Sequence, residues 1–505
     1  MDAEVARTAT MADAVGHDRV AGSDARRLRR LVVALGLGWS ALFILVGVGY
    51  GLQMYADGSI FSYSVAVRAG WAFHFHNIAD RMFVYFFSHM PAEAYVALTG
   101  DARGGIFLYG LLFFAAPLAG LLACFAADRS PSRIVFGYAC LSTACLCPMV
   151  FGFPTEMWVA HSAFWPALAL CQYARRSIAG WAAAFAAMLA LALTHEGGLV
   201  FACAIVATVA LRGLRDPAFL RAAGVLVVVL AVWVAIKVML PPGRYYAAII
   251  PAAEMNFIDV RSLLMSGFVT LLIAALAGYG AVLLVLRRLA PARAWVAAFA
   301  LVALALAVYW QWFDHSLHTQ NRYYVRTAIF FATPVLGGLA VLRALRAEDR
   351  LCLPAAWMTR LATALADGVA ALAQGRAARA AVGAILILTL VHAVETAKFV
   401  VGWTRYEAAV RALAMGAASD PALGDPRFVS SDRIDADTNR LAWQTTTQFL
   451  SVLVAPGLAP ARLVIDPSAG YFWLSCKLAT AVEQSDRALP VEGRRLMRVH
   501  ACLHR

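Results

Sequence analysis

The sequence predicts an all-α polytopic membrane protein with about eleven transmembrane helices and a small α/β domain at the C-terminal end. Of its 505 residues, 62% are hydrophobic and 14% are charged, against roughly 25% charged residues in a typical soluble domain. The mean hydropathy is +0.70, and apolar stretches of about twenty residues recur along most of the chain. Too few polar residues remain to cover a water-soluble fold, so a disordered chain and an ectodomain on a single anchor are also excluded.

Each predicted span is close to the length needed to cross a hydrocarbon core of about 30 Å. The first covers 31–53, after a basic tail at 1–30. The others are expected at 106–126, 134–152, 158–174, 178–194, 199–211, 222–240, 267–286, 294–312, 327–342 and 381–400. Every second loop carries arginines, and the positive-inside rule then places the N-terminus in the cytoplasm and the C-terminus outside.

Two long segments connect or flank these spans. A first long loop covers 54–105 on the predicted outer side. On the cytoplasmic side, 353–374 place Trp357, Leu361 and Leu365 on one helical face, which predicts an interfacial helix lying flat on the membrane.

The remaining segment is the tail at 401–505, which is polar enough to form a small periplasmic domain. Its short apolar runs are bounded by Pro, Gly and Asp, a pattern typical of a mixed α/β unit. Cys476 and Cys502 are its two cysteines, and a pair in an oxidising compartment is a disulfide candidate.

The net charge of +13 does not indicate a nucleic-acid partner, because the basic residues cluster between apolar segments, where the positive-inside rule accounts for them. The bilayer is therefore the partner that this charge predicts. The Ala- and Arg-rich composition suggests a high-GC bacterium, and hence its inner membrane.

Nearly all ionisable residues that are candidates for function fall at span ends and in loops of the predicted outer side, whereas a transporter is expected to place charges at mid-membrane depth. These candidates are Asp57, His74, His76, Asp80, Arg81, His89, Glu156, His161, His195, Glu196, Arg244, Glu254, Asp259, Asp314, His315, His318, Arg322 and Arg326. Their one-sided distribution favours an active site at the outer face.

Three short motifs carry a family resemblance. Asp57 directly follows the first span in Tyr55-Ala56-Asp57-Gly58-Ser59; Thr194-His195-Glu196-Gly197-Gly198 forms a tight outer turn; and Asn321-Arg322-Tyr323-Tyr324, with Pro334 further on, opens a late span. In this order, the motifs resemble those of the GT-C superfamily of membrane glycosyltransferases over most of 31–400. One departure is that Gly58 follows Asp57, where many members carry a second acid.

The resemblance implies a GT-C-like fold and an inverting enzyme that uses a polyprenyl-phosphate-linked sugar and modifies an envelope glycan or glycolipid. It makes Asp57 the candidate general base, with Glu156, Glu196 and Asp80 as rivals.

Chemistry points the same way, because sugar transfer needs a base at the acceptor hydroxyl and cations at the leaving phosphate. The cations expected at the phosphate are Arg322 and Arg326, four residues apart on one helical face, with Arg244 and His318 as further donors. A substrate groove is expected from His195, Asp80, Tyr323 and Tyr245. No spacing demands a metal ion, and a divalent metal near Asp57 is left open.

Other functions stay open at this point. An O-antigen ligase or polymerase-like enzyme also uses outer arginines and histidines, but it usually concentrates them in one large late loop, and the loop at 313–326 is short. A lipid or solute transporter would move its substrate without turnover. A structural membrane protein would tolerate substitution of the outer acids.

Overall fold

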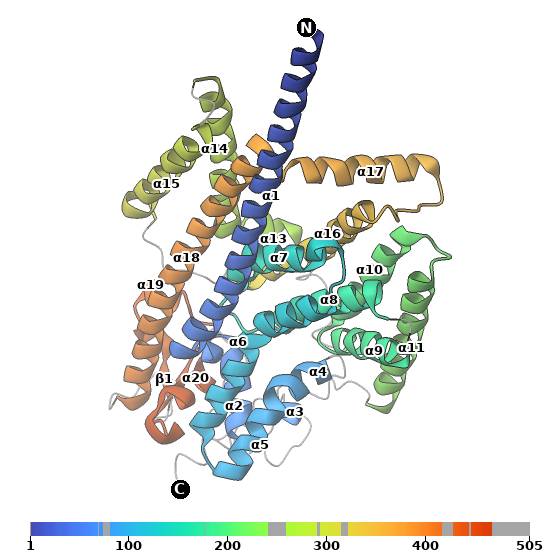
Figure 1. Cartoon of the computed structure of the whole chain (residues 1–505). Helices are drawn as coiled ribbons and strands as arrows, with labels where there is room; N and C mark the ends of the chain where they lie inside the picture. The colour runs from blue at the N-terminus through green and yellow to red at the C-terminus, as the bar shows by residue number, and fades with distance from the viewer. Residues whose placement is uncertain are drawn as a thin grey trace.

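The computed structural model describes residues 2–68, 70–73, 81–175, 177–240, 259–289, 293–314, 322–416, 428–443 and 446–466. Side chains are described for these residues except 2–23, 72–73 and 322–324. The chain is mostly helical, and its long helices form a bundle (Figure 1).

Eight helices in the described part of the chain are long and apolar enough to cross a membrane, which confirms a multi-pass membrane protein. They are α1 (Asp2–Gly49, span from Asp24), α6 (Ala102–Ala127), α7 (Ile134–Val150, span from Pro131), α11 (Pro217–Met239), α14 (Gly267–Leu289), α15 (Ala294–Trp312), α16 (Arg322–Ala347, span from Val325) and α18 (Gly375–Met415).

The three other expected spans coincide with α8 (Glu156–Tyr173), α9 (Ile178–Ala192) and α10 (Glu196–Val209). These helices have 18, 15 and 14 residues. At 1.5 Å per residue, α9 and α10 rise only about 21–23 Å, less than the hydrocarbon thickness of about 30 Å. Within the described part of the chain, length and apolarity therefore support eight spans, and the predicted count of about eleven is not confirmed.

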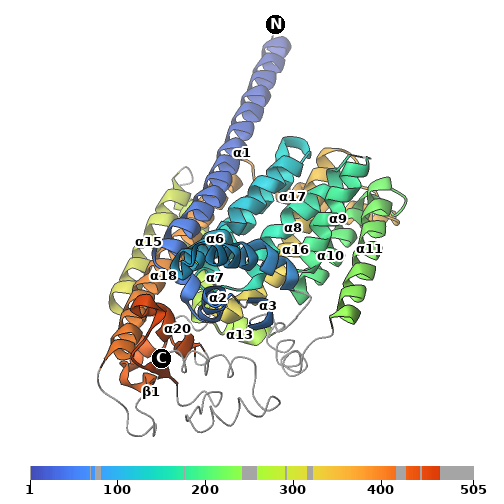
Figure 2. The same cartoon turned by 90° about the horizontal axis from the view of Figure 1, so that it is seen from below.

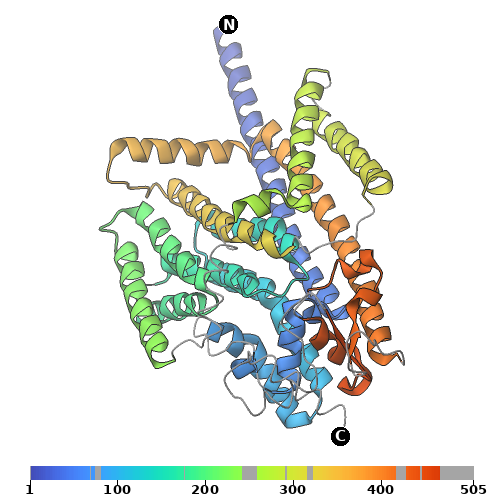
Figure 3. The same cartoon turned by 180° about the vertical axis from the view of Figure 1, so that it is seen from behind.

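The first long loop folds into short helices. These elements are η1 (Leu52–Met54), α2 (Asp57–Ala66), α3 (Gly70–Phe73), α4 (Met82–Val84), the π-helical turn η3 (Tyr85–His89) and α5 (Met90–Thr99). In Figures 1 and 3, α2 and α5 lie at the end of the bundle opposite the N-terminus of α1.

Connecting elements complete the membrane part. They are η4 (Pro131–Arg133), η5 (Ala210–Arg212), α13 (Val260–Leu264) and α17 (Ala356–Ala371). Helix α17 runs crosswise to the bundle on the side of the N-terminus (Figure 1). The α14–α15 hairpin lies beside α18 (Figure 3), where Lys398 Nζ contacts Asp314 Oδ2 at 2.7 Å.

The described C-terminal residues 428–443 and 446–466, called the C-terminal unit below, contain a pair of short parallel strands. The elements are β1 (Phe428–Ser430), η7 (Ser431–Arg433), α19 (Ala436–Asn439), α20 (Thr447–Val454), η8 (Pro456–Leu458) and β2 (Leu463–Ile465). Val429 pairs with Val464 in the register of the strands. Helix α18 is continuous through the expected boundary at residue 400, so the last span and the start of the tail are one 41-residue helix. The predicted disulfide cysteines lie outside the described residues.

The C-terminal unit packs against the first long loop. The Ser59 hydroxyl donates to the Thr446 carbonyl oxygen at 3.0 Å, and the Tyr63 and Phe449 rings lie 5.3 Å apart. Figure 2 shows the unit beside α18, and Figure 1 shows that the unit and α2 both lie away from the N-terminus of α1. These contacts bring the C-terminal unit next to α2, nearly 400 residues earlier in the chain.

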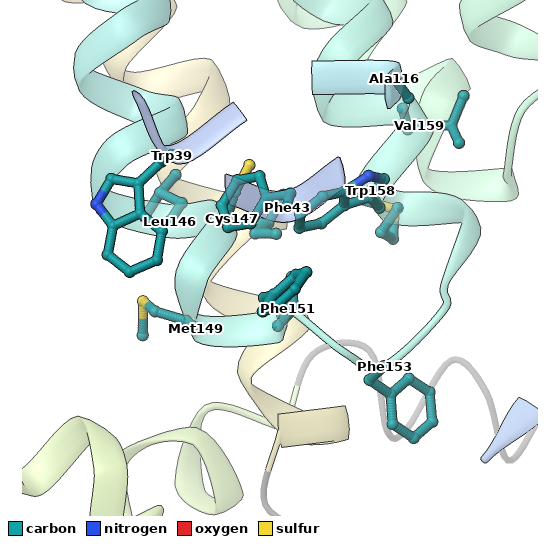
Figure 4. Close-up of a cluster of buried hydrophobic side chains, with 14 of the residues drawn as sticks. Trp39, Phe43, Ala116, Leu146, Cys147, Met149, Phe151, Phe153, Trp158 and Val159 are labelled. Atoms are coloured by element: carbon teal, nitrogen blue, oxygen red, sulfur yellow. The ribbon is translucent and has the colours of Figure 1, made fainter. Parts of the chain in front are cut away.

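An aromatic core holds α8 in position. Phe43 of α1 packs against Trp158 of α8, with ring centroids 4.8 Å apart, and against Phe151 at 4.9 Å (Figure 4). The Trp158 indole donates to the Phe113 carbonyl at 3.1 Å. At Gly120 of α6, an added Cβ would lie 2.3 Å from the Ser162 carbonyl, so these helices approach as closely as a glycine allows. This packing fixes the N-terminus of α8, where Glu156 lies.

Candidate functional site

Asp57 is the first residue of α2, immediately after a tight turn that follows α1. Gly51 (φ 66°) adopts the left-handed conformation in that turn, and Ala56 also has a positive φ of 50°. At Gly58, an added Cβ would lie 2.3 Å from the Gln53 carbonyl oxygen and 2.6 Å from the Pro154 ring. The local backbone thus requires glycine after Asp57, which explains why a second acid does not follow it.

Glu156 begins α8 and is paired with an arginine from the first long loop. Arg81 Nη1 donates to Glu156 Oε1 at 2.9 Å, and Arg81 Nη2 lies 3.9 Å from Glu196 Oε1. Glu156 is only 6% exposed, and a buried carboxylate requires a nearby positive charge, which Arg81 supplies. Sequence analysis named Arg81 among the outer candidates but gave it no role, because its partners lie on distant helices.

His195 caps the N-terminus of α10 in the tight turn predicted from the sequence. Its Nδ1 accepts the Gly197 amide at 3.0 Å, which requires an unprotonated Nδ1. Burial lowers the pKa of His195, so a neutral ring is favoured. Glu196 follows directly, with Oε2 3.3 Å from His195 Nδ1. The Phe83 amide donates to the Leu193 carbonyl at 2.8 Å and joins the first long loop to this turn.

Arg326 lies near the start of α16 and supplies a second cation. It is 7% exposed, and its charge acts on both Asp57 and His195. Arg322 begins the same helix, but its side chain and that of Tyr323 lie outside the described part of the structure. Asp80, Arg244, Tyr245 and His318 also lie outside the described residues, so their predicted roles stay predictions.

The carboxyl group of Asp57 has a raised pKa. Burial and the nearby charge of Glu156 raise its pKa from 3.8 to about 6, against the opposing influence of Arg326, Arg81 and Trp443. The side chain nevertheless keeps part of its surface open. A partly accessible carboxylate with a pKa close to neutral is suited to accept a proton from a bound substrate.

Trp443 is the member of the site that sequence reasoning missed. Its side chain hydrogen-bonds to Asp57, and its ring packs edge-on against Phe153 with centroids 5.2 Å apart. Trp443 belongs to the C-terminal unit, nearly 400 residues along the chain from its partner. No local motif marks it, and only the docking of the unit against α2 brings it to the carboxylate.

Other polar candidates from the sequence are engaged elsewhere. His161 Nε2 lies 2.8 Å from the Ser142 hydroxyl inside the helix core, His89 Nδ1 lies 3.1 Å from the Ser88 hydroxyl, and Asp314 pairs with Lys398. His74 and His76 lie outside the described residues. Within the described part of the chain, no group of three or more His, Cys, Asp or Glu residues is arranged to hold a metal ion.

The structure therefore groups the charged side chains of Asp57, Glu156, Glu196, Arg81 and Arg326. The neutral side chains of His195 and Trp443 lie beside them. Comparisons with protein-family models, curated proteins and solved structures find no match for this chain. Its chemistry is consequently argued from its own residues.

Proposed function

We propose that this chain is a membrane glycosyltransferase that transfers a sugar, with inversion, from a polyprenyl-phosphate-linked donor to a cell-envelope glycan or glycolipid. The reaction is assigned to the outer face of a bacterial inner membrane, with the N-terminus cytoplasmic and the C-terminus periplasmic. The observation that carries the proposal is the carboxyl of Asp57, whose pKa burial and Glu156 raise to about 6, within the influence of Arg81 and Arg326.

Asp57 acts as the general base in this proposal. As an acceptor hydroxyl attacks the anomeric carbon, its proton passes to the carboxylate and a new carbon–oxygen bond forms. The bond from that carbon to the donor phosphate breaks, and the phosphate oxygen keeps the electron pair. A base with a pKa near the working pH is ionised before the reaction and still holds the proton afterwards.

The other two carboxylates are better suited to structural roles. Glu156 is paired at 2.9 Å with Arg81, which also lies near Glu196. Carboxylates held by a cation are poor proton acceptors, because protonation would break the ion pair. This pairing favours Asp57 over Glu156 and Glu196 as the base.

Arg326 is the described cation assigned to the leaving phosphate. It is buried at the start of α16 and already interacts with the charge of Asp57. A fixed cation in a poorly hydrated place stabilises negative charge as it develops, without having to reorient. Arg322, one turn earlier in α16, is assigned the same role.

The short helices α9 and α10 support a lipid-borne donor. Helix α9 begins just after the basic loop at Arg175 and rises about 22 Å to the turn that contains His195. With that basic loop at one face of the membrane, the turn lies within the hydrocarbon thickness of about 30 Å, close to the opposite face. A phosphate attached to a polyprenyl chain can reach this depth more readily than a soluble sugar nucleotide.

The direct test is sugar transfer by the purified protein in nanodiscs from a panel of synthetic polyprenyl-phosphate sugars to envelope glycan and glycolipid acceptors. Wild type would be compared with Asp57→Asn and with the exposed control Asp437→Asn. We expect transfer that Asp57→Asn abolishes and the control retains. Absence of transfer with every donor, together with lipid or solute movement in proteoliposomes, would instead support a transporter. Joining of preassembled glycan chains would support the ligase-like alternative.

A further inference from the structure

Helices α14 and α18 pack antiparallel, and the end of α14 meets the start of α18. The Phe268 ring of α14 lies 5.6 Å from the His392 ring of α18, and the Tyr279 hydroxyl donates to the Ala380 carbonyl at 3.1 Å. Higher residue numbers on α14 thus meet lower numbers on α18. Figures 1 and 3 show both helix ends on the side of the N-terminus of α1.

This packing places three arginines on facing sides of the two helices. Arg376 and Arg379 share one side of α18 with Gly383, where an added Cβ would collide with the Tyr279 hydroxyl, so that side faces α14. Arg287 lies about two turns after Tyr279 on α14, and its charge acts on that tyrosine. At 1.5 Å per residue, Arg287 and Arg376 differ by only about 6 Å along the helix axes. The three side chains, called the arginine cluster below, can therefore meet around one group.

The arginine cluster concentrates positive charge without an acidic partner. Among the described residues, none of its members makes an ion pair. Arg376 and Arg379 also stand in the first two turns of α18, where the helix dipole disfavours positive charge. The positive-inside rule explains arginines at this end of the bundle, but arginines spread over the surface would satisfy it equally well. Like charges on facing helix sides instead indicate a bound anion.

The surroundings of the arginine cluster favour an anion with apolar chains. Arg287 and Arg376 are exposed and Arg379 is half-buried, so the cluster is accessible. Beside it, Leu284 and Leu289 of α14 are 65% and 76% exposed. Both helices are long and apolar enough to cross a membrane, and basic side chains at the ends of such helices lie at the level of the lipid headgroups. A phospholipid supplies the anion and the apolar chains together.

We propose that the arginine cluster binds the phosphate of an anionic phospholipid, of the phosphatidylglycerol type, in the leaflet on the side of the N-terminus. The guanidinium groups donate to the phosphate oxygens, and an acyl chain lies along Leu284 and Leu289. A zwitterionic lipid fits less well, because its ammonium group is repelled by the same three arginines. The cluster lies at the opposite end of the bundle from α2, so the proposal does not rest on sugar transfer.

The test measures lipid binding to the delipidated full-length protein by native mass spectrometry. The probes are phosphatidylglycerol, phosphatidylcholine and phosphatidylethanolamine with identical acyl chains. We expect phosphatidylglycerol to bind at least about tenfold more tightly than the two zwitterionic lipids. The double variant Arg287→Gln/Arg379→Gln should lose most of that preference. The control Arg129→Gln/Arg215→Gln removes the same charge from exposed arginines of other basic loops and should retain it.

Equal affinity for the three lipids, or an equal loss of preference in both double variants, would overturn the proposal, because the latter result indicates only general attraction to a basic surface. Thermal unfolding in nanodiscs adds a second readout. In phosphatidylcholine, Arg287→Gln should raise the Tm by relieving repulsion, whereas in phosphatidylglycerol it should lower the Tm by removing a phosphate contact. The same shift in both lipids would contradict the assignment.

Inorganic phosphate distinguishes a lipid headgroup from a soluble anion. Added to wild type in phosphatidylcholine nanodiscs, it should raise the Tm less than phosphatidylglycerol does. An equal rise would assign the arginine cluster to a soluble anion and overturn the lipid proposal. Because Arg287 is exposed, the single variant Arg287→Gln keeps the test decisive if the double variant fails to fold.

Discussion

Replacing Asp57 with Asn is expected to stabilise the protein while it abolishes the proposed sugar transfer. Burial and the charge of Glu156 raise the pKa of Asp57 from 3.8 to about 6. One pKa unit corresponds to about 1.4 kcal/mol, so ionising this carboxyl in the folded state costs up to about 3 kcal/mol. Because part of the side chain remains open to solvent, we expect the substitution to raise the free energy of unfolding by about 1–3 kcal/mol at pH 7.5.

The sign of the effect determines its pH dependence. The folded state binds the proton of Asp57 more tightly than the unfolded state does. The contribution of this group to stability is therefore fully present below the unfolded pKa of 3.8 and is lost as the pH rises through about 6. Asn does not titrate, so the difference in stability between variant and wild type should grow between about pH 4 and pH 6 and then stay constant.

The assay is thermal unfolding of wild type, Asp57→Asn and Asp437→Asn in nanodiscs between pH 4.5 and 8, with transfer activity measured on the same samples. We expect a higher Tm for Asp57→Asn at pH 7.5, a smaller difference at pH 4.5, and no such trend for Asp437→Asn. A variant that is less stable than wild type at pH 7.5 would mean that the nearby arginines stabilise the anion more than burial destabilises it. That result would refute the reasoning.

Three further predictions concern the residues around this carboxyl. Trp443→Phe removes a hydrogen bond that lowers the pKa of Asp57, so the acidic limb of the pH profile of kcat/KM should move to higher pH. Arg81→Gln removes the cation that pairs with the buried Glu156 at 2.9 Å, and we expect a loss of about 3–5 kcal/mol in the free energy of unfolding, measured by denaturant titration. Gly58→Ala places a Cβ against backbone and should cost about 1–3 kcal/mol by the same measurement.

Matched substitutions separate these effects from general damage. Arg405→Gln removes an exposed arginine, and Gly38→Ala adds a Cβ where no atom lies within 4 Å. Arg405→Gln should leave stability within about 0.5 kcal/mol of wild type, and Gly38→Ala, inside helix α1, should leave it unchanged or raise it by up to about 1 kcal/mol. An unchanged pH profile in Trp443→Phe would show that the indole does not act on Asp57. If the controls lost as much stability as Arg81→Gln and Gly58→Ala do, those losses would not come from the Arg81–Glu156 ion pair or from the close packing at Gly58.

The long spans could be predicted from the sequence because their signal is local. A helix such as α6 must bury or expose to lipid an almost unbroken apolar surface, and hydropathy alone reveals it. The helices α8, α9 and α10 were harder to assign. Helix α8 is surrounded by other helices of the same chain, and this buried position accommodates the polar side chains of Glu156 and His161. Helices α9 and α10 are shorter than the membrane is thick. Composition does not distinguish a short helix packed inside a bundle from a complete span.

The candidate site was only partly predictable. Asp57, Glu196 and Arg326 were identified because they stand at span ends, where charges are uncommon and costly. Trp443 and the pairing of Arg81 could not be identified, because both depend on contacts between segments far apart in the chain. The glycine after Asp57 also has a reason invisible in the sequence, because the backbone of Gln53 and the ring of Pro154 leave no room for a side chain at Gly58.

The hydrogen bond between Trp443 and Asp57 has a consequence for biosynthesis. Asp57 is made early in translation and its partner late, after all eight long apolar helices. During that interval the carboxyl lacks the contact that favours its ionised form. A nascent chain, or one that ends before Trp443, therefore lacks a side chain that contacts Asp57 in the folded protein. The proposed site would be complete only after the C-terminal unit has docked against α2.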